Sequence, residues 1–140
     1  MSDSKRFLGI DYGSRRIGIA VSDPLGIIAQ GIGVVINDPG AIDEICEYAR
    51  KFDVRAVIVG MPLTLKGEKG QSALAVDKFI VKLKESLAVE ILSLDERWTS
   101  ATAHETLLTL GVKKKKRQSK ETIDKMAAAL ILQSYLDSRR

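Results

Sequence analysis

The sequence predicts one α/β domain covering residues 1–140, in which helices cover both faces of a mixed five-stranded sheet. Two observations indicate this class. The chain opens with short segments rich in Ile, Val and Gly that turn residues separate, and its later apolar segments alternate with stretches of helical periodicity. We therefore expect the first three strands to be antiparallel and the later strands to be parallel. No internal repeat and no long linker divides the chain.

The antiparallel strands are expected at residues 6–11, 16–22 and 26–35. The third of these segments contains a glycine-rich stretch, residues 31–35, which we expect at an edge of the sheet. Asp38-Pro39-Gly40 ends this strand, and a helix is expected to follow. Its apolar residues recur at helical spacing and are Ile42, Ile45, Cys46 and Ala49.

The rest of the chain predicts two parallel strands and three helices. Residues 55–60 contain Ala-Val-Ile-Val, which is apolar at every position, as in a strand covered by helices on both faces. A helical stripe follows at 72–87, and a fifth strand is expected at 89–94. Two helices, at about 100–110 and 119–136, are expected to close the chain.

Composition excludes several classes of protein. No stretch approaches the roughly 20 apolar residues of a membrane span, and the N-terminus does not fit a signal peptide. The single cysteine, Cys46, cannot form an internal disulfide and is expected to be a small buried side chain. These features predict a cytoplasmic protein without membrane contact, and none of them indicates the oligomeric state.

The positive charge lies at the C-terminal end. Residues 113–140 contain nine basic and three acidic side chains, whereas the rest contains 13 basic and 15 acidic ones. This pattern favours a polyanionic partner such as nucleic acid, although a run of cations can also be a solvated loop that only aids solubility. The run consists of Lys113, Lys114, Lys115, Lys116 and Arg117.

Three acidic residues are candidates for a functional site. Asp11 ends the first strand, and Glu96 follows the fifth, so both are expected at the carboxyl edge of the sheet, where open α/β folds bind ligands. Asp124 lies on the apolar face of the last predicted helix. A carboxylate there needs a partner, which can be Lys120, Lys125, the helix dipole or a metal ion.

Carboxylates that converge at one sheet edge repel one another unless a cation lies among them. Oxygen ligands favour Mg²⁺ or Mn²⁺, whose chemistry is typical of phosphodiester hydrolysis. Zinc does not fit, because His104 is the only histidine and Cys46 the only thiol.

Four ordered motifs resemble the YqgF family of bacterial proteins over nearly the whole chain. They are Gly9-Ile-Asp11-Tyr-Gly13 with its continuation to Asp23, Val59-Gly60-Met61-Pro62 with Gly67 and Gly70, Asp95-Glu96-Arg97-Trp98-Thr99-Ser100, and Asp124-Lys-Met-Ala-Ala-Ala with its continuation to Leu136. The resemblance implies an RNase H-like fold similar to RuvC-type Holliday-junction resolvases. It also implies a nuclease that matures the 5′ end of 16S ribosomal RNA, with Asp11, Glu96 and Asp124 as catalytic carboxylates and metal ligands.

The sequence departs from the resolvase relatives at one point. They are expected to carry an acid on the strand after the first helix, where this chain has Val59-Gly60-Met61-Pro62, so the second acid must come from Glu96. Arg16 and Arg97, beside the proposed acids, can bind nucleic-acid phosphates or pair with a carboxylate. Asp23 belongs to the opening motif, and its Asp-Pro-Leu-Gly context is also typical of a turn.

Alternative functions remain at this point. One is a Holliday-junction resolvase-like DNA endonuclease acting on branched DNA, and another is a ribosomal-RNA-binding module without catalysis. The first motif also resembles the phosphate-binding turn of sugar-kinase and actin-type ATPases. Those enzymes close two such domains over a nucleotide, so one domain of 140 residues argues against that class.

Overall fold

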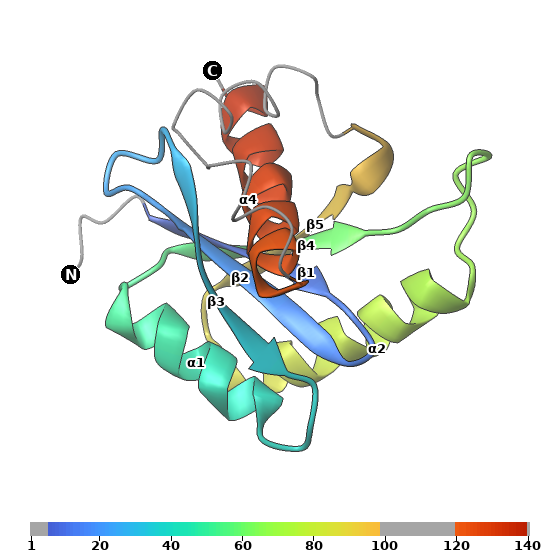
Figure 1. The fold of residues 1–140 in the computed structure, drawn as a ribbon, viewed down its shortest axis with the longest axis horizontal. Helices are drawn as coiled ribbons and strands as arrows, with labels where there is room; N and C mark the ends of the chain where they lie inside the picture. The colour runs from blue at the N-terminus through green and yellow to red at the C-terminus, as the bar shows by residue number, and fades with distance from the viewer. Residues whose placement is uncertain (1–5, 99–119, 140) are drawn as a thin grey trace.

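The computed structural model describes residues 6–98 and 120–139. Its five strands form one sheet in the order β3-β2-β1-β4-β5, so the first strand is central (Figure 1). β1 pairs antiparallel with β2 and parallel with β4, which confirms the predicted mixed sheet. The strands are β1 Phe7–Tyr12, β2 Arg16–Ser22, β3 Ala29–Ile36, β4 Ala56–Met61 and β5 Glu90–Asp95.

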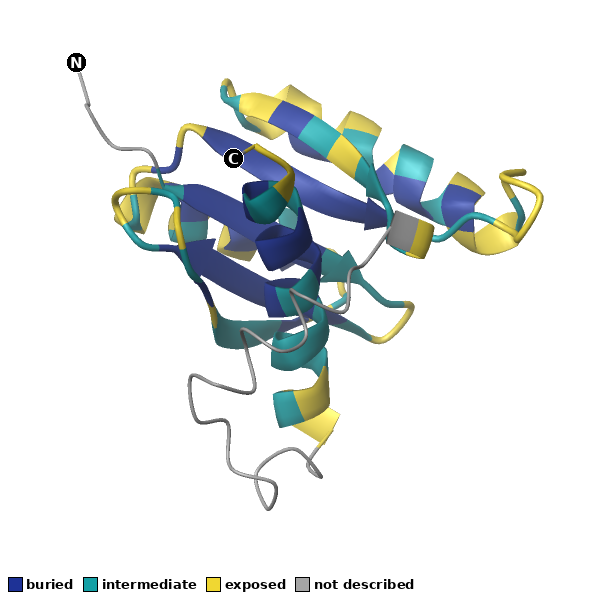
Figure 2. Cartoon of the chain, turned by 90° about the horizontal axis from the view of Figure 1, so that it is seen from above, coloured by how far each residue is buried: buried dark blue, intermediate teal, exposed yellow. Residues whose placement is uncertain are grey.

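Helices cover both faces of this sheet, as expected. The helices α1, Ala41–Lys51, and α2, Gln71–Ser86, lie on one face, and α4, Lys120–Ser138, crosses the other (Figures 1 and 2). A short 3-10 helix, η1, Glu96–Trp98, follows β5. The helix expected at about 100–110 lies outside the described residues. Among those residues, no helix is long and apolar enough to span a bilayer.

The sheet separates two hydrophobic cores, and successive side chains of each strand point alternately into one core and the other. Leu8 and Ile10 of β1 enter the core beneath α1 and α2, which also buries Cys46 as expected. Phe7 faces α4, together with Ala20 and residues of the helix itself. Because successive side chains of a strand point to opposite faces, Asp11 shares the α4 face with Phe7.

The third strand begins three residues later than expected, because Asp23 organises a turn before it. The Asp23 carboxylate accepts hydrogen bonds from the backbone N–H groups of Leu25, Ile27 and Ile28. Burial alone would raise the pKa of Asp23, but these bonds outweigh it and lower the pKa. Asp23 therefore has a structural role in this turn. β3 does form an edge of the sheet.

Helix α4 packs unusually close to the sheet because glycines face it. A Cβ built on Gly9 would lie 2.6 Å from the Leu132 Cβ, and one on Gly18 would strike the backbone oxygen of Asp124. Gln133, fully buried, fixes the helix to the strand edge: its Oε1 accepts from the Ala29 N–H at 2.9 Å. Glycine in the strands and Gln133 in the helix together set where the start of α4 lies over the sheet.

Candidate active site

Asp11 lies between two glycines on the α4 face of the sheet. It pairs with Gly18 of β2, and on its other side the register of Ile10 with Val59 brings it beside Gly60 of β4. Neither glycine has a side chain, so space opens above the sheet on both sides of the Asp11 carboxylate. A different acidic residue lies above each of these glycines.

Asp124 occupies the space above Gly18. The close approach of α4 to β2 places its backbone there, and its carboxylate accepts a hydrogen bond from Arg16 Nε at 2.6 Å. The Asp124 side chain is 20% exposed and that of Arg16 35%. Among the described residues, the cation that pairs with Asp124 is thus Arg16 and neither Lys120 nor Lys125.

Glu96 occupies the space beside Gly60. It is the first residue of η1, directly after β5, and its carboxyl carbon lies 3.1 Å from the point where a Gly60 Cβ would be. The sequence lacks an acid in the segment around Gly60, where the resolvase relatives are expected to carry one. In the structure, the Glu96 carboxylate lies in the space next to Gly60 instead.

Electrostatics link these acids into one group. Burial raises the pKa of Asp11, and the negative charge of Asp124 raises it further. Burial also raises the pKa of Glu96, with further contributions from the charges of Asp11 and Asp95. Asp11 is therefore the middle member, which interacts with Asp124 on one side and Glu96 on the other.

This donor set suits a hard divalent cation chemically. Partly buried carboxylates that raise one another's pKa favour bound positive charge, and carboxylate oxygens are the ligands of Mg²⁺ and Mn²⁺. Within residues 6–98 and 120–139, no three acidic, histidine or cysteine side chains form a ready cage for one ion. The acids are instead arranged as two pairs that share Asp11.

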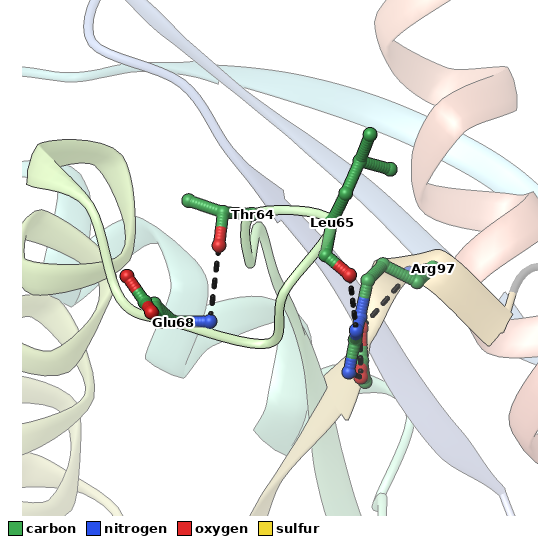
Figure 3. Close-up of polar contacts among 5 residues, drawn as sticks. Thr64, Leu65, Glu68 and Arg97 are labelled. Atoms are coloured by element: carbon green, nitrogen blue, oxygen red, sulfur yellow. Dashed lines mark hydrogen bonds and ion pairs between the residues drawn. The ribbon is translucent and has the colours of Figure 1, made fainter.

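Arg97 pairs with Asp95 next to Glu96 and also reaches the loop that contains Leu65, Thr64 and Glu68 (Figure 3). Arg97 Nε and Nη2 donate to the Asp95 carboxylate, at 3.0 and 2.6 Å to Oδ2, and Nη1 donates to the Leu65 carbonyl at 3.1 Å. Hydrogen bonding by Arg97 holds the pKa of Asp95 below its usual range. The loop containing Leu65 is itself closed by the Glu68 N–H donating to Thr64 Oγ1 at 3.1 Å. Arg97 thereby ties this loop to the segment that carries Glu96.

The remaining predicted site residues lie outside the described part of the chain. They are Lys113, Lys114, Lys115, Lys116 and Arg117 of the basic run. Their predicted contact with nucleic acid stays a prediction.

A family model described as "RuvX: Holliday junction resolvase" matches residues 5–138. The chain belongs to the RuvX family. Its relatives include proteins named "Putative pre-16S rRNA nuclease". One from Sulfurihydrogenibium sp. is 41% identical over 134 residues, covering 94% of this chain and 90% of the relative. Another from Chloroflexus aggregans is 42% identical over 140 residues, covering 99% and 97%.

The fold of this RuvX family member is also found in a solved structure of Thermus thermophilus RuvC in complex with a Holliday junction substrate. The TM-score is 0.64 with 17% sequence identity, and the match covers 96% of this chain and 94% of the RuvC chain. The RuvC-like fold implied by the resemblance is therefore confirmed.

In this RuvX family member, sequence reasoning missed the features that bring the acids together. Gly18 and Gly60 were visible as residues of the motifs, but only the packing shows that each leaves space for an acid. The signal available in the sequence was their position: both are glycines within otherwise apolar strands, where glycine often marks a close approach of another group.

Proposed function

We propose that this RuvX family member is a metal-dependent nuclease that hydrolyses phosphodiester bonds in precursor 16S ribosomal RNA, in the cytoplasm, during ribosome biogenesis. The observation that carries the proposal is the arrangement of Asp11 between Asp124 and Glu96 on the α4 face, with Arg16 paired to Asp124. The RNA substrate is supported by the names of the relatives at about 40% identity.

Asp11, Glu96 and Asp124 would hold Mg²⁺ or Mn²⁺ at the carboxyl edge of the sheet. When bound, such an ion supplies an activated water and neutralises charge at the phosphodiester. The described residues offer no alternative nucleophile with a base beside it: Cys46 is buried in the other core, and burial raises the pKa of its thiol. Hydrolysis by an activated water is therefore the chemistry that these side chains support.

The decisive experiment is cleavage of precursor 16S ribosomal RNA by the purified chain with and without Mg²⁺ or Mn²⁺. We expect metal-dependent cleavage that leaves a 5′-phosphate and a 3′-hydroxyl, because two-metal carboxylate sites direct water at phosphorus. A 2′,3′-cyclic phosphate, or full activity in excess chelator, would contradict the mechanism. Binding without cleavage under all metal conditions would instead favour an RNA-binding module.

A second candidate is cleavage of branched DNA. It is favoured by the description of the matching family model and by the RuvC-like fold. Four-way DNA junctions belong in the same assay. Strong cleavage of junctions without cleavage of the RNA would keep the metal site and replace the substrate.

The two predicted phosphate-binding arginines differ in how many of their side-chain nitrogens already donate hydrogen bonds to the described residues. Every side-chain nitrogen of Arg97 already donates to Asp95 or Leu65. Arg16 uses only Nε, on Asp124, so among the described residues its Nη1 and Nη2 have no partner. Asp124 orients this guanidinium, and its free edge suits the two oxygens of a phosphate. We infer that Arg16 is the substrate-binding arginine of the pair.

Arg16→Lys is expected to raise the KM for RNA roughly tenfold, since a charge-assisted hydrogen bond contributes about 1.5–3 kcal/mol and Lys lacks the planar fork. Arg97→Lys is the matched comparison: because Arg97 ties the Leu65 loop to the segment that carries Glu96, its substitution should act on kcat and leave the KM unchanged. Steady-state kinetics of both variants give the comparison. An equal rise of KM in both, or a rise only in Arg97→Lys, would refute the assignment.

We also propose that the basic run, residues 113–117, binds the nucleic-acid backbone, on the evidence of its charge alone. If about four of its cations contact phosphates of single-stranded RNA, log affinity should fall with log salt at a slope near −3, at ~0.7 per contact. Replacing all five by Ser or Gln should flatten that slope in a binding titration. An unchanged affinity and slope would exclude the run from the interface.

A further inference from the structure

The position of Glu96 depends on a residue that carries no functional group. Gly60 is buried in β4, in register with Leu94 of β5, and its missing side chain would point to the face on which Asp11 lies. A Cβ on Gly60 would lie 3.1 Å from the Glu96 carboxyl carbon and 3.2 Å from its Cγ. Such contacts are tighter than ordinary van der Waals packing, so Glu96 would have to shift by a few tenths of an ångström.

The same Cβ would also lie 2.6 Å from Ile131 Cδ1 of α4. Gly60 therefore meets two neighbours with different roles. Ile131 is a core residue whose δ-methyl group belongs to the packing of α4 on the sheet. Glu96 belongs to the acidic group. The two effects of adding a side chain at this position can be separated, because shortening Ile131 relieves only the first.

We propose that Gly60 is the positioning residue for Glu96: the space left by its absent side chain allows a carboxylate from the segment after β5 to stand beside Asp11. The inference rests on the proposed metal site, because it explains how Glu96 comes to be one of the acids of that site. A side chain at position 60 would press on the Glu96 side chain, so an acid at position 60 and the Glu96 carboxylate would share the space beside Asp11.

The first test is Gly60→Ala in the background of Ile131→Val, compared with Ile131→Val alone. The shortened Ile131 removes the methyl group that a Cβ at position 60 would strike, so the double variant should keep the thermal stability of the single one. Its Mn²⁺ affinity, measured by titration calorimetry on the full chain, should be lower by roughly tenfold, as when support of a metal ligand is lost. Equal Mn²⁺ affinities for the two proteins would overturn the proposal.

A second test moves the carboxylate. Glu96→Ala with Ile131→Val should lose Mn²⁺ affinity, and adding Gly60→Asp should restore most of it, because the new carboxylate lies on the strand beside Asp11. A purely structural role of Gly60 predicts no such rescue. Failure of Gly60→Asp to improve binding over the Glu96→Ala, Ile131→Val protein would contradict the shared space.

A crystal structure of the Gly60→Ala, Ile131→Val protein separates this inference from the proposed function. The Glu96 side chain should be shifted away from position 60 by at least a few tenths of an ångström relative to the Ile131→Val protein, whether or not a metal is bound. If the wild-type chain binds no Mn²⁺, the proposed metal site is wrong, while the position of Glu96 still decides the role of Gly60. An unmoved Glu96 would overturn that role.

Discussion

Asp11→Asn is expected to lower RNA cleavage by about three orders of magnitude, which corresponds to about 4 kcal/mol of transition-state stabilisation. Asp11 is the acid that interacts with both Asp124 and Glu96, so its loss leaves those two carboxylates without the member that links them. Single-turnover cleavage in Mg²⁺ is the measurement. Asp77→Asn is a suitable control: Asp77 lies on α2 in the other layer and pairs with Lys69, so its substitution should leave the rate unchanged.

The same substitution should raise the thermal stability of the metal-free protein at neutral pH. Burial and Asp124 raise the pKa of Asp11 in the folded state, so ionised Asp11 opposes folding above that pKa. The gain should disappear as the pH falls below the ordinary carboxyl range, where Asp11 is protonated in both states. Thermal unfolding of the two proteins at pH 7 and near pH 3 tests this sign. A loss of stability at pH 7, or retained cleavage, would contradict the placement of Asp11.

Of the two glycines beside Asp11, Gly18 and Gly60, we expect alanine at Gly18 to lower stability more. Gly18→Ala should reduce the free energy of unfolding by about 3 kcal/mol or more. The new Cβ would strike the backbone oxygen of Asp124, and a helix backbone cannot rotate aside as a side chain can. Gly70→Ala is the matched control, because nothing lies within 4 Å of a Cβ there. Denaturant unfolding of both variants measures the difference.

Gly18→Ala should also impair cleavage in whatever fraction remains folded, since α4 carries Asp124 and would be lifted from the sheet. A variant as stable as the Gly70→Ala protein would show that α4 does not approach β2 as closely as described.

The sheet could be predicted from the sequence because its information is local. Each buried strand, such as β4 with Ala-Val-Ile-Val, shows its environment in its own residues, and the order of strands and helices then limits the topology. The start of β3 was misplaced because Asp23 binds three following N–H groups. Apolar residues such as Ile27 and Ile28 lie inside that turn and look like strand residues.

The identity of the candidate acids was also predictable, since strand ends and an acid on an apolar helix face are readable patterns. Their partners were not. Arg16 and Asp124 are separated by 108 positions, and nothing around Asp124 in sequence distinguishes that partner from the neighbouring lysines. The role of Gly60 was equally hidden, because a glycine shows what it makes room for only once the surrounding elements are packed.

The long span between Asp11 and Asp124 also sets the order in which the site is assembled. Contacts of α4 with β1 and β2, such as Gly9 with Leu132, close loops of more than 100 residues, as does the bond between Ala29 and Gln133. Contacts between residues so far apart in sequence are slow to form. Before α4 docks, a growing chain has the sheet and the Asp11 strand but lacks the third acid and the core that Leu132 completes. During synthesis on the ribosome, the chain therefore completes its acidic group only once α4 has been made and has docked on the sheet. A copy that still lacks α4 carries Asp11 and Glu96 without Asp124.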